Sequence, residues 1–127
     1  MPAYKHILVP TDGSKLSLTA ARAATALAKS LKAKITAIYV IEPWFPPLGE
    51  DSSTMYSLGA AQEEYRKATG KTASNALAKV TAVARAAGVG CEDLQVIHTR
   101  PWQGIIDTAR KRRCDLIIMG SRGRGSP

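Results

Sequence analysis

Long apolar runs are missing from this 127-residue sequence. No stretch approaches the roughly 20 consecutive apolar residues that a membrane-spanning helix needs. The opening MPAYKHILVPTDG also lacks the apolar segment of a signal peptide. Cysteine is scarce: Cys91 and Cys114 have neither CxxC spacing nor a histidine pair beside them, so no zinc site is expected. These absences favour a cytoplasmic protein with reduced thiols and no membrane contact.

Two common phosphate-binding motifs are absent as well. The sequence has no GxxxxGK[ST], which argues against a P-loop enzyme, and no GxGxxG after its first apolar run, which argues against a dinucleotide-binding fold. Ser14 and Ser121 have no histidine nearby in the sequence, so no pair of nucleophile and base is apparent. We therefore expect a binding module rather than a dedicated enzyme.

Charge is unevenly divided between the two signs. Eighteen lysines and arginines against ten acidic residues give a formal net charge of +8, which attracts polyanions such as nucleotides, nucleic acids or anionic surfaces. The run RKRR at 110–113 is best explained as the solvated end of a helix. Because no aromatic residues interleave with it to stack on bases, nucleic-acid binding is not expected.

The spacing of apolar residues changes repeatedly along the chain. Short runs rich in branched residues predict buried strands, and spacings of three and four predict helices. Strands are expected at 5–10, 33–42, 91–98 and 115–119, with helices after the N-cap Ser14, at 57–87 and after Pro101. This alternation predicts one α/β domain over residues 1–127, with a parallel sheet and helices on both faces.

Ligands of such sheets bind at the carboxyl ends of the strands, where the direction of winding reverses. We expect that crevice between the first and fourth strands. The residues expected to bind the ligand there are Pro10, Thr11 and Asp12 after the first strand, Val40 near the end of the second, and Gly120, Arg122 and Gly123 after the fourth.

The glycine-rich stretch GSRGRGS after the fourth strand has two interpretations. Gly120 and Gly123 would expose successive backbone amides as an anion nest, and Arg122 would add a charge-assisted bond to a phosphate. A flexible basic tail is the alternative, because such residues are often disordered at a terminus. The position directly after a buried strand favours phosphate binding.

Other polar and apolar residues also allow two interpretations. Asp12 could accept a hydrogen bond from a ribose hydroxyl or hold a Mg²⁺ ion that bridges phosphates, or it could be a turn residue before Gly13. Val40 could present its backbone to an adenine edge, or it could belong to the core. His6 and His98 lie on different strands without a third ligand, and we expect both to be structural.

Three motifs together resemble the universal stress protein family: KHILVPTDGS at the start, AIYVIEP at the end of the second strand, and CDLIIMGSRGRG near the end. The resemblance covers nearly the whole order of elements. It implies a flavodoxin-like fold, similar to the adenine nucleotide α-hydrolases, in which helices sandwich a five-stranded parallel sheet. It also implies a role in stress response and a dimer. One branch of the family binds ATP through G-x-x-G-x(9)-G-[S/T] after the fourth strand.

For this chain, the resemblance implies an ATP site, with Mg²⁺ as a possible companion of the nucleotide. Asp12 would contact the ribose or the metal, and Val40 would contact adenine through its backbone. The phosphate path would be lined by Met119, Gly120, Arg122 and Gly123. Slow ATP hydrolysis or self-phosphorylation is the most activity that we expect.

The chain departs from the family pattern after the G-x-x-G at 120–123, because a nine-residue spacer would carry the second half of the motif beyond Pro127. We therefore expect a C-terminally shortened domain with the fifth strand missing. Its affinity for ATP should be weakened, because the phosphates lose backbone donors. Strand 115–119 would become an apolar sheet edge, which predicts a homodimer or homo-oligomer paired through it.

Three other classes of protein were weighed against this interpretation. An enzyme of the ATP pyrophosphatase type would need an SGGxDS loop, and TDGSKLS lacks its paired glycines. A receiver domain would need an acidic pair after the first strand and an aspartate after the third, where this chain has His98, Thr99 and Arg100. A module of the same fold that binds polyanions or proteins without a nucleotide remains the alternative.

Overall fold

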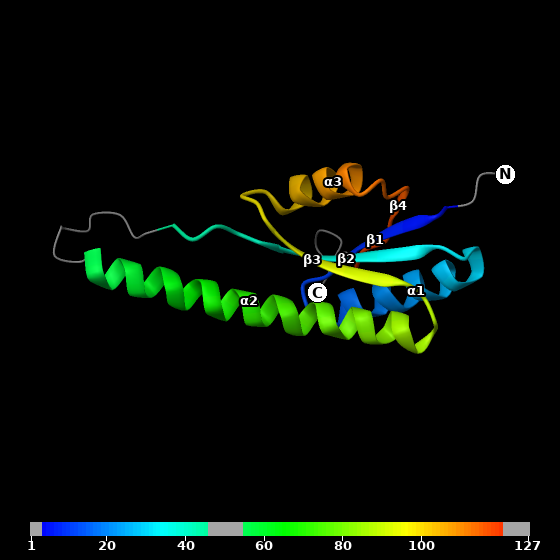
Figure 1. Cartoon of the computed structure of the whole chain (residues 1–127), viewed down its shortest axis with the longest axis horizontal. Coiled ribbons are helices and arrows are strands. Elements are labelled where there is room, and N and C mark those ends of the chain that lie inside the picture. Colours follow the sequence, from blue (N-terminus) through cyan, green and yellow to red (C-terminus); the bar gives the residue numbers. More distant parts are fainter. Residues whose placement is uncertain (1–3, 46–54, 121–127) are drawn as a thin grey trace, which may run out of the picture.

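A computed structural model describes residues 4–45 and 55–120 (Figure 1). The elements are β1 (His6–Pro10), α1 (Lys15–Leu31), β2 (Lys34–Ile41), α2 (Met55–Ala86), β3 (Cys91–Ile97), α3 (Pro101–Lys111) and β4 (Leu116–Ile117). Strands and helices alternate throughout, which confirms the predicted α/β class. Ser14 is the N-cap of α1 as expected, with its side chain accepting from the Ser17 amide.

The four described strands form one parallel sheet in the order β3-β2-β1-β4. Ile7 of β1 is paired with Ile35 of β2 on one side and with Leu116 of β4 on the other. The chain winds outward from β1 to β3 and then crosses back to place β4 beside β1. The winding therefore reverses between β1 and β4, where the sequence predicted it, and a crevice opens there at the carboxyl ends of the strands.

Helices cover both faces of the sheet: α1 and α2 lie on one face and α3 on the other (Figure 1). Successive residues of β1 point to opposite faces, so Ile7 and Val9 pack toward α1 and α2 while Leu8 packs toward α3. Helix α1 contributes only alanines to the fully buried core on its side: Ala21, Ala24 and Ala28. These small side chains let the helix lie close to the strands.

The two edge strands differ from the prediction of buried, continuously apolar strands. Strand β4 comprises Leu116 and Ile117 rather than 115–119, although the Ile118 amide still donates to the Leu8 carbonyl at 3.0 Å. Strand β3 alternates half-buried and exposed residues, with Glu92 and Gln95 exposed. Both strands have a neighbour on one side only within the described sheet, so neither is enclosed as β1 is.

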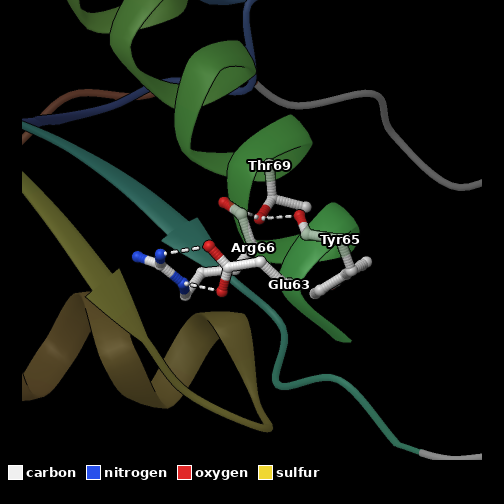
Figure 2. A network of polar contacts seen from close by, with 4 residues as sticks. All are labelled: Glu63, Tyr65, Arg66 and Thr69. Carbon is white, nitrogen blue, oxygen red and sulfur yellow. Dashed lines mark hydrogen bonds and ion pairs between the residues drawn. The ribbon is translucent and has the colours of Figure 1, made fainter. Parts of the chain in front are cut away.

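Helix α2 runs without interruption from Met55, and Gly70 does not divide it. Its first half extends beyond the sheet in Figure 1. The Tyr65 hydroxyl donates to the Glu42 carbonyl at 2.6 Å and ties this part of the helix to the chain after β2. Figure 2 shows the neighbouring contacts, an Arg66–Glu63 ion pair at 2.7 Å and a bond from the Thr69 hydroxyl to the Tyr65 carbonyl. The ion pair is exposed to solvent and stabilises the helix little.

Candidate functional site

A cavity of about 250 Å³ opens at the carboxyl end of β1. It is lined by Pro10, Thr11, Asp12, Ser17, Ile38, Val40, Pro101, Ile105, Met119 and Gly120. Six of the eight residues predicted from the sequence therefore lie around one cavity, although they come from three separate parts of the chain. The other two, Arg122 and Gly123, lie outside the described residues.

The loop after β1 is held in place by its own backbone and hydroxyl groups. The Thr11 amide donates to the Ile38 carbonyl at 2.9 Å, which extends the pairing of β1 with β2 by one residue. The Thr11 hydroxyl accepts from the Gly13 amide at 3.1 Å. Gly13 has φ +84°, a left-handed conformation that favours glycine and lets the chain turn from the strand into α1.

Asp12 is fixed by the residues that begin α1. Its Oδ1 accepts from the Ser14 amide at 2.9 Å and from the Ser17 hydroxyl at 2.5 Å. Hydrogen bonds from Ser14 and Ser17 stabilise the carboxylate and lower the pKa of Asp12 from 3.8 to about 2. Within the described residues both bonds go to Oδ1, so Oδ2 can accept a hydrogen bond from a ligand.

The opposite part of the cavity is apolar. Ile38 is buried, and Val40 and Ile105 are half-buried, so this wall joins the carboxyl half of β2 to the start of α3. Met119 is 47% exposed at the rim. The lining thus combines an ionised carboxylate with apolar side chains, a combination suited to a ligand with a flat apolar part and several polar groups.

Gly120 brings the end of β4 against the first turn of α1. A Cβ at this position would lie 2.8 Å from the carbonyl oxygen of Leu16 and 2.9 Å from its carbonyl carbon. Real Cβ atoms do not approach backbone atoms so closely, so only glycine fits without a shift of the chain. Leu16, in the first turn of α1 beside this contact, is 39% exposed.

Four cavity residues were not identified from the sequence: Ser17, Ile38, Pro101 and Ile105. Ser17 is the third helical residue after the N-cap, and such a position can bond back to the loop before the helix. Pro101 follows the third strand end, which the topology directs to the same edge of the sheet. Nothing in the local sequence distinguishes Ile38 and Ile105 from core residues.

Both histidines make contacts within the fold. His6 is buried, and its Nε2 lies 2.6 Å from the Thr36 hydroxyl. Burial lowers the pKa of His6, so the ring is neutral at physiological pH. His98 accepts from the Arg100 amide through Nδ1 at 2.9 Å. Over the described part of the chain, no group of three His, Cys, Asp or Glu residues could hold a metal ion.

Asp12 is the one carboxylate among the described residues that line the cavity. A Mg²⁺ ion here would need most of its oxygen ligands from phosphates and water, as is usual for this cation in nucleotide sites. The donor set therefore fits a magnesium ion carried by a nucleotide rather than one bound by the protein alone.

None of the described helices is long and apolar enough to cross a membrane.

Comparison with known proteins gave consistent matches. The family model for the universal stress protein family matches residues 3–127. "Universal stress protein MJ0531" of Methanocaldococcus jannaschii is 37% identical over 128 residues, covering 95% of this chain and 66% of that protein. The "Universal stress protein in QAH/OAS sulfhydrylase 3'region" of Thermus aquaticus is 32% identical over 123 residues, covering 97% of this chain and 81% of that protein. This chain thus spans just under two thirds of the archaeal relative.

Solved structures show the same fold. A universal stress protein family member from Burkholderia pseudomallei superimposes with a TM-score of 0.73 at 25% identity, covering 93% of this chain and 82% of that one. A universal stress protein in complex with cAMP has a TM-score of 0.62 at 24% identity, over 91% of this chain and 72% of that one. One from Archaeoglobus fulgidus in complex with dAMP has a TM-score of 0.58 at 16% identity, over 91% and 80%.

The family model covers almost the whole sequence, the curated relatives exceed 30% identity, and the topology and layering are those of the solved structures. The chain belongs to the universal stress protein family.

Proposed function

We propose that this chain binds an adenine nucleotide in the cavity at the carboxyl ends of β1 and β4. The observation that carries the proposal is the meeting of Asp12, Val40 and Gly120 around one cavity between separate strands. Two proteins of the same fold are described in complex with cAMP and dAMP, which both contain adenine, a sugar and a phosphate. The proposed ligand has the same three parts.

Each part of the nucleotide has a matching surface in the cavity. The ionised Asp12 accepts a hydrogen bond from a sugar hydroxyl through Oδ2, and its low pKa keeps it charged at physiological pH. The apolar wall of Ile38, Val40 and Ile105 packs against the adenine ring. The phosphates lie toward Gly120 and the N-terminal end of α1, where backbone amides and the helix dipole favour negative charge.

ATP is the nucleotide that we propose, accompanied by Mg²⁺ when the metal bridges its phosphates. The predicted phosphate-binding residues Arg122 and Gly123 follow Gly120 directly in the sequence. An arginine there would form charge-assisted bonds to phosphate oxygens, so a triphosphate should bind more tightly than AMP. Slow ATP hydrolysis, a role in stress response and a cytoplasmic location stay predictions for this chain.

Isothermal titration of the full chain with ATP and AMP, each with and without Mg²⁺, tests the proposal. Asp12→Asn should weaken ATP binding by about tenfold to a hundredfold, because one charge-assisted hydrogen bond is worth about 1.5–3 kcal/mol. Asp93→Asn on β3 is the matched control, since Asp93 is exposed and does not line the cavity. Equal affinity in the wild type and in Asp12→Asn would contradict the assignment.

The same titration addresses the alternative of a module that binds polyanions or proteins without a nucleotide. The +8 net charge favours that alternative. Under it, ATP, GTP and inorganic triphosphate would bind equally well, and the affinity would fall steeply as salt is added. Under the nucleotide proposal, ATP binds more tightly than GTP and more tightly than inorganic triphosphate, because the apolar wall contacts the base.

We also propose that the chain self-associates through β4. This strand is an edge of the described sheet, and its backbone can pair with another strand on its outer side. Ile117 is 38% exposed on the strand, and Met119, just beyond it, is 47% exposed. Pairing of two such edges would cover both side chains and satisfy the outer backbone groups.

A further inference from the structure

A second concavity, of about 550 Å³, lies at the opposite end of the sheet from the candidate nucleotide site. Four of its ten lining residues are lysines, and the others are glycines, alanines and one valine: Lys5, Lys29, Lys32, Lys34, Gly88, Gly90, Ala28, Ala33, Ala87 and Val89. We call it the lysine cleft. In Figure 1 the elements that form it, the start of β2, the end of α1 and the turn after α2, meet at the right.

The four lysines come from separate segments of the fold. Lys5 precedes β1, Lys29 lies in the last turn of α1, Lys32 is its C-cap and Lys34 begins β2. Pairing of the strands fixes their spacing, because the Lys34 amide donates to the Lys5 carbonyl at 3.0 Å and the Ile35 amide donates to the Gly90 carbonyl at 2.8 Å. Strand pairing therefore fixes Lys5 beside Lys34, and the end of α1 carries Lys29 and Lys32 to the same concavity.

None of the four lysines forms an ion pair with a carboxylate among the described residues. None of the lining residues is acidic, and the ion pairs of the described chain, which lie at Arg66, His98 and Arg112, involve none of the four lysines. The Asp115 carboxylate, which accepts from the backbone amides of Lys5 and His6 at 3.0–3.2 Å, offsets part of the positive charge at this end of the sheet. Like charges held together without a partner repel one another, and an anion that binds among them removes this cost.

The C-terminal end of α1 would oppose an anion if its carbonyls were free, because that end of a helix is partly negative. Here two of these carbonyls accept hydrogen bonds. Lys32 adopts a left-handed conformation with φ 58°, and its amide points back to the carbonyls of Ala28 and Lys29. The Ala33 amide also donates to the Ala28 carbonyl at 2.8 Å. The lysine ammonium groups therefore dominate the electrostatics of the cleft.

We propose that the lysine cleft binds a small, multiply charged phosphate anion. Ammonium groups on long stems suit a compact anion with several oxygens, because each can reach a different oxygen as a point charge. The lining offers no aromatic ring on which a base could stack, so a phosphate chain fits the cleft better than a nucleic acid. Binding here is independent of the nucleotide cavity, which lies at the other end of the strands.

Inorganic tripolyphosphate, added without metal to the full chain, is the probe. Two-dimensional NMR of the backbone amides should show saturable shifts at Lys32, Gly88 and Gly90, with smaller changes at Thr11, Asp12 and Gly13. Shifts confined to the second group would place the phosphate in the nucleotide cavity and overturn the proposal. Shifts that grow without saturation at every lysine would show general attraction to a basic surface, and would overturn it as well.

The double variant Lys29→Gln/Lys34→Gln should weaken tripolyphosphate binding at least tenfold, because it removes two charge-assisted contacts. Lys67→Gln/Lys71→Gln on α2 is the matched control, with the same change of charge at two exposed positions outside the cleft. Equal weakening in both double variants overturns the proposal. Lys5→Gln provides a second, single substitution in the cleft, should the first variant not fold, and should weaken binding in the same direction.

The result does not depend on the nucleotide site. Asp12→Asn should leave tripolyphosphate binding unchanged within twofold, and Lys29→Gln/Lys34→Gln should leave ATP binding at the other cavity unchanged. If Asp12→Asn loses ATP but keeps tripolyphosphate, both proposals stand. If ATP binds nowhere while tripolyphosphate still shifts Gly88 and Gly90, only the nucleotide proposal fails.

Discussion

Asp12 and Ser17 are joined by two hydrogen bonds in the candidate site. The Ser17 hydroxyl donates to the Asp12 carboxylate and also accepts from the Asp12 amide at 3.2 Å. One hydroxyl therefore fixes both the side chain and the backbone of the residue proposed to contact the sugar. Ser17 is a positioning residue in this arrangement: it acts on the ligand through Asp12.

Ser17→Ala should raise the pKa of Asp12 from about 2 toward its ordinary value of 3.8, because the carboxylate loses a hydrogen bond that favours its charged form. The Asp12 carboxylate stabilises the folded chain fully above pH 3.8, and this contribution is lost as the pH falls through about 2. In the variant the contribution should be smaller, and its loss should be complete at a higher pH. Carboxyl carbon NMR over pH 1.5–6 measures both pKa values.

Ser30→Ala is the control for that titration, because Ser30 is an exposed residue near the other end of α1. This substitution should leave the pKa of Asp12 at its wild-type value. An Asp12 pKa that does not respond to Ser17→Ala would mean that Ser14 and the turn backbone stabilise the carboxylate without Ser17.

At the scale of elements, the two halves of the continuous helix α2 have different surroundings. From Ala73 to Ala84 it buries six residues against the sheet and α1: Ala73, Ala76, Leu77, Val80, Thr81 and Ala84. From 58 to 70 it has no fully buried side chain. At 1.5 Å per residue the 32-residue helix is roughly 48 Å long, nearly twice the span of the eight-residue β2. The sheet cannot support its whole length.

We therefore expect hydrogen exchange to be faster at 58–70 than at 73–84, since local opening of the first half breaks few buried contacts. Tyr65→Phe should accelerate exchange further in the first half alone, because it removes the bond to the Glu42 carbonyl. Mass spectrometry of deuterated peptides measures this. Uniform protection along α2 would contradict the prediction.

The elements also show how far the sequence can be interpreted without a structure. The spacing of apolar residues, which alternates between strand-like and helix-like periods, predicted the order of all seven described elements. This order could be predicted because it depends only on local spacing. The pattern predicted a longer β4 than the structure has, because nothing in the apolar run 115–119 shows where the strand must end so that Gly120 can approach Leu16. It also predicted β3 as a buried strand, because its position at the edge depends on long-range pairing that local pattern does not contain.

For the site, the strand ends identified the polar residues, and the topology brought Asp12 and Gly120 together as expected. The apolar wall was harder to predict, since Ile38 and Ile105 resemble core residues in any sequence window. Which apolar residues border a cavity is decided by packing between helix α3 and the sheet. That information is absent from the local sequence of either element.

At the scale of the whole molecule, the described sheet has two edges of different chemistry. The β3 edge exposes the charged residues Glu92 and Asp93, which discourage pairing with another chain, although Ile97 at the end of the strand is exposed as well. The β4 edge has the apolar Ile117 and Met119 partly exposed. Self-association should therefore use β4 and avoid β3.

Sedimentation velocity over a hundredfold range of concentration tests this. The wild type should form dimers or larger oligomers, and Ile117→Lys should weaken the association at least tenfold, because a charge on the edge strand opposes pairing. Ile97→Lys on β3 is the matched control, at an isoleucine that is 68% exposed, and should leave association intact. A wild-type monomer at high concentration, or equal effects of both variants, would contradict the proposal.

The contact between Gly120 and Leu16 has a consequence for how the crevice accommodates its ligand. The two backbones already touch, so one wall cannot move inward without displacing the other, and the smallest opening of the crevice is set before any ligand arrives. The crevice should then select ligands by the thickness of their ring. A flat ring enters, whereas a ring with a bulky substituent on either face requires α1 and the end of β4 to separate.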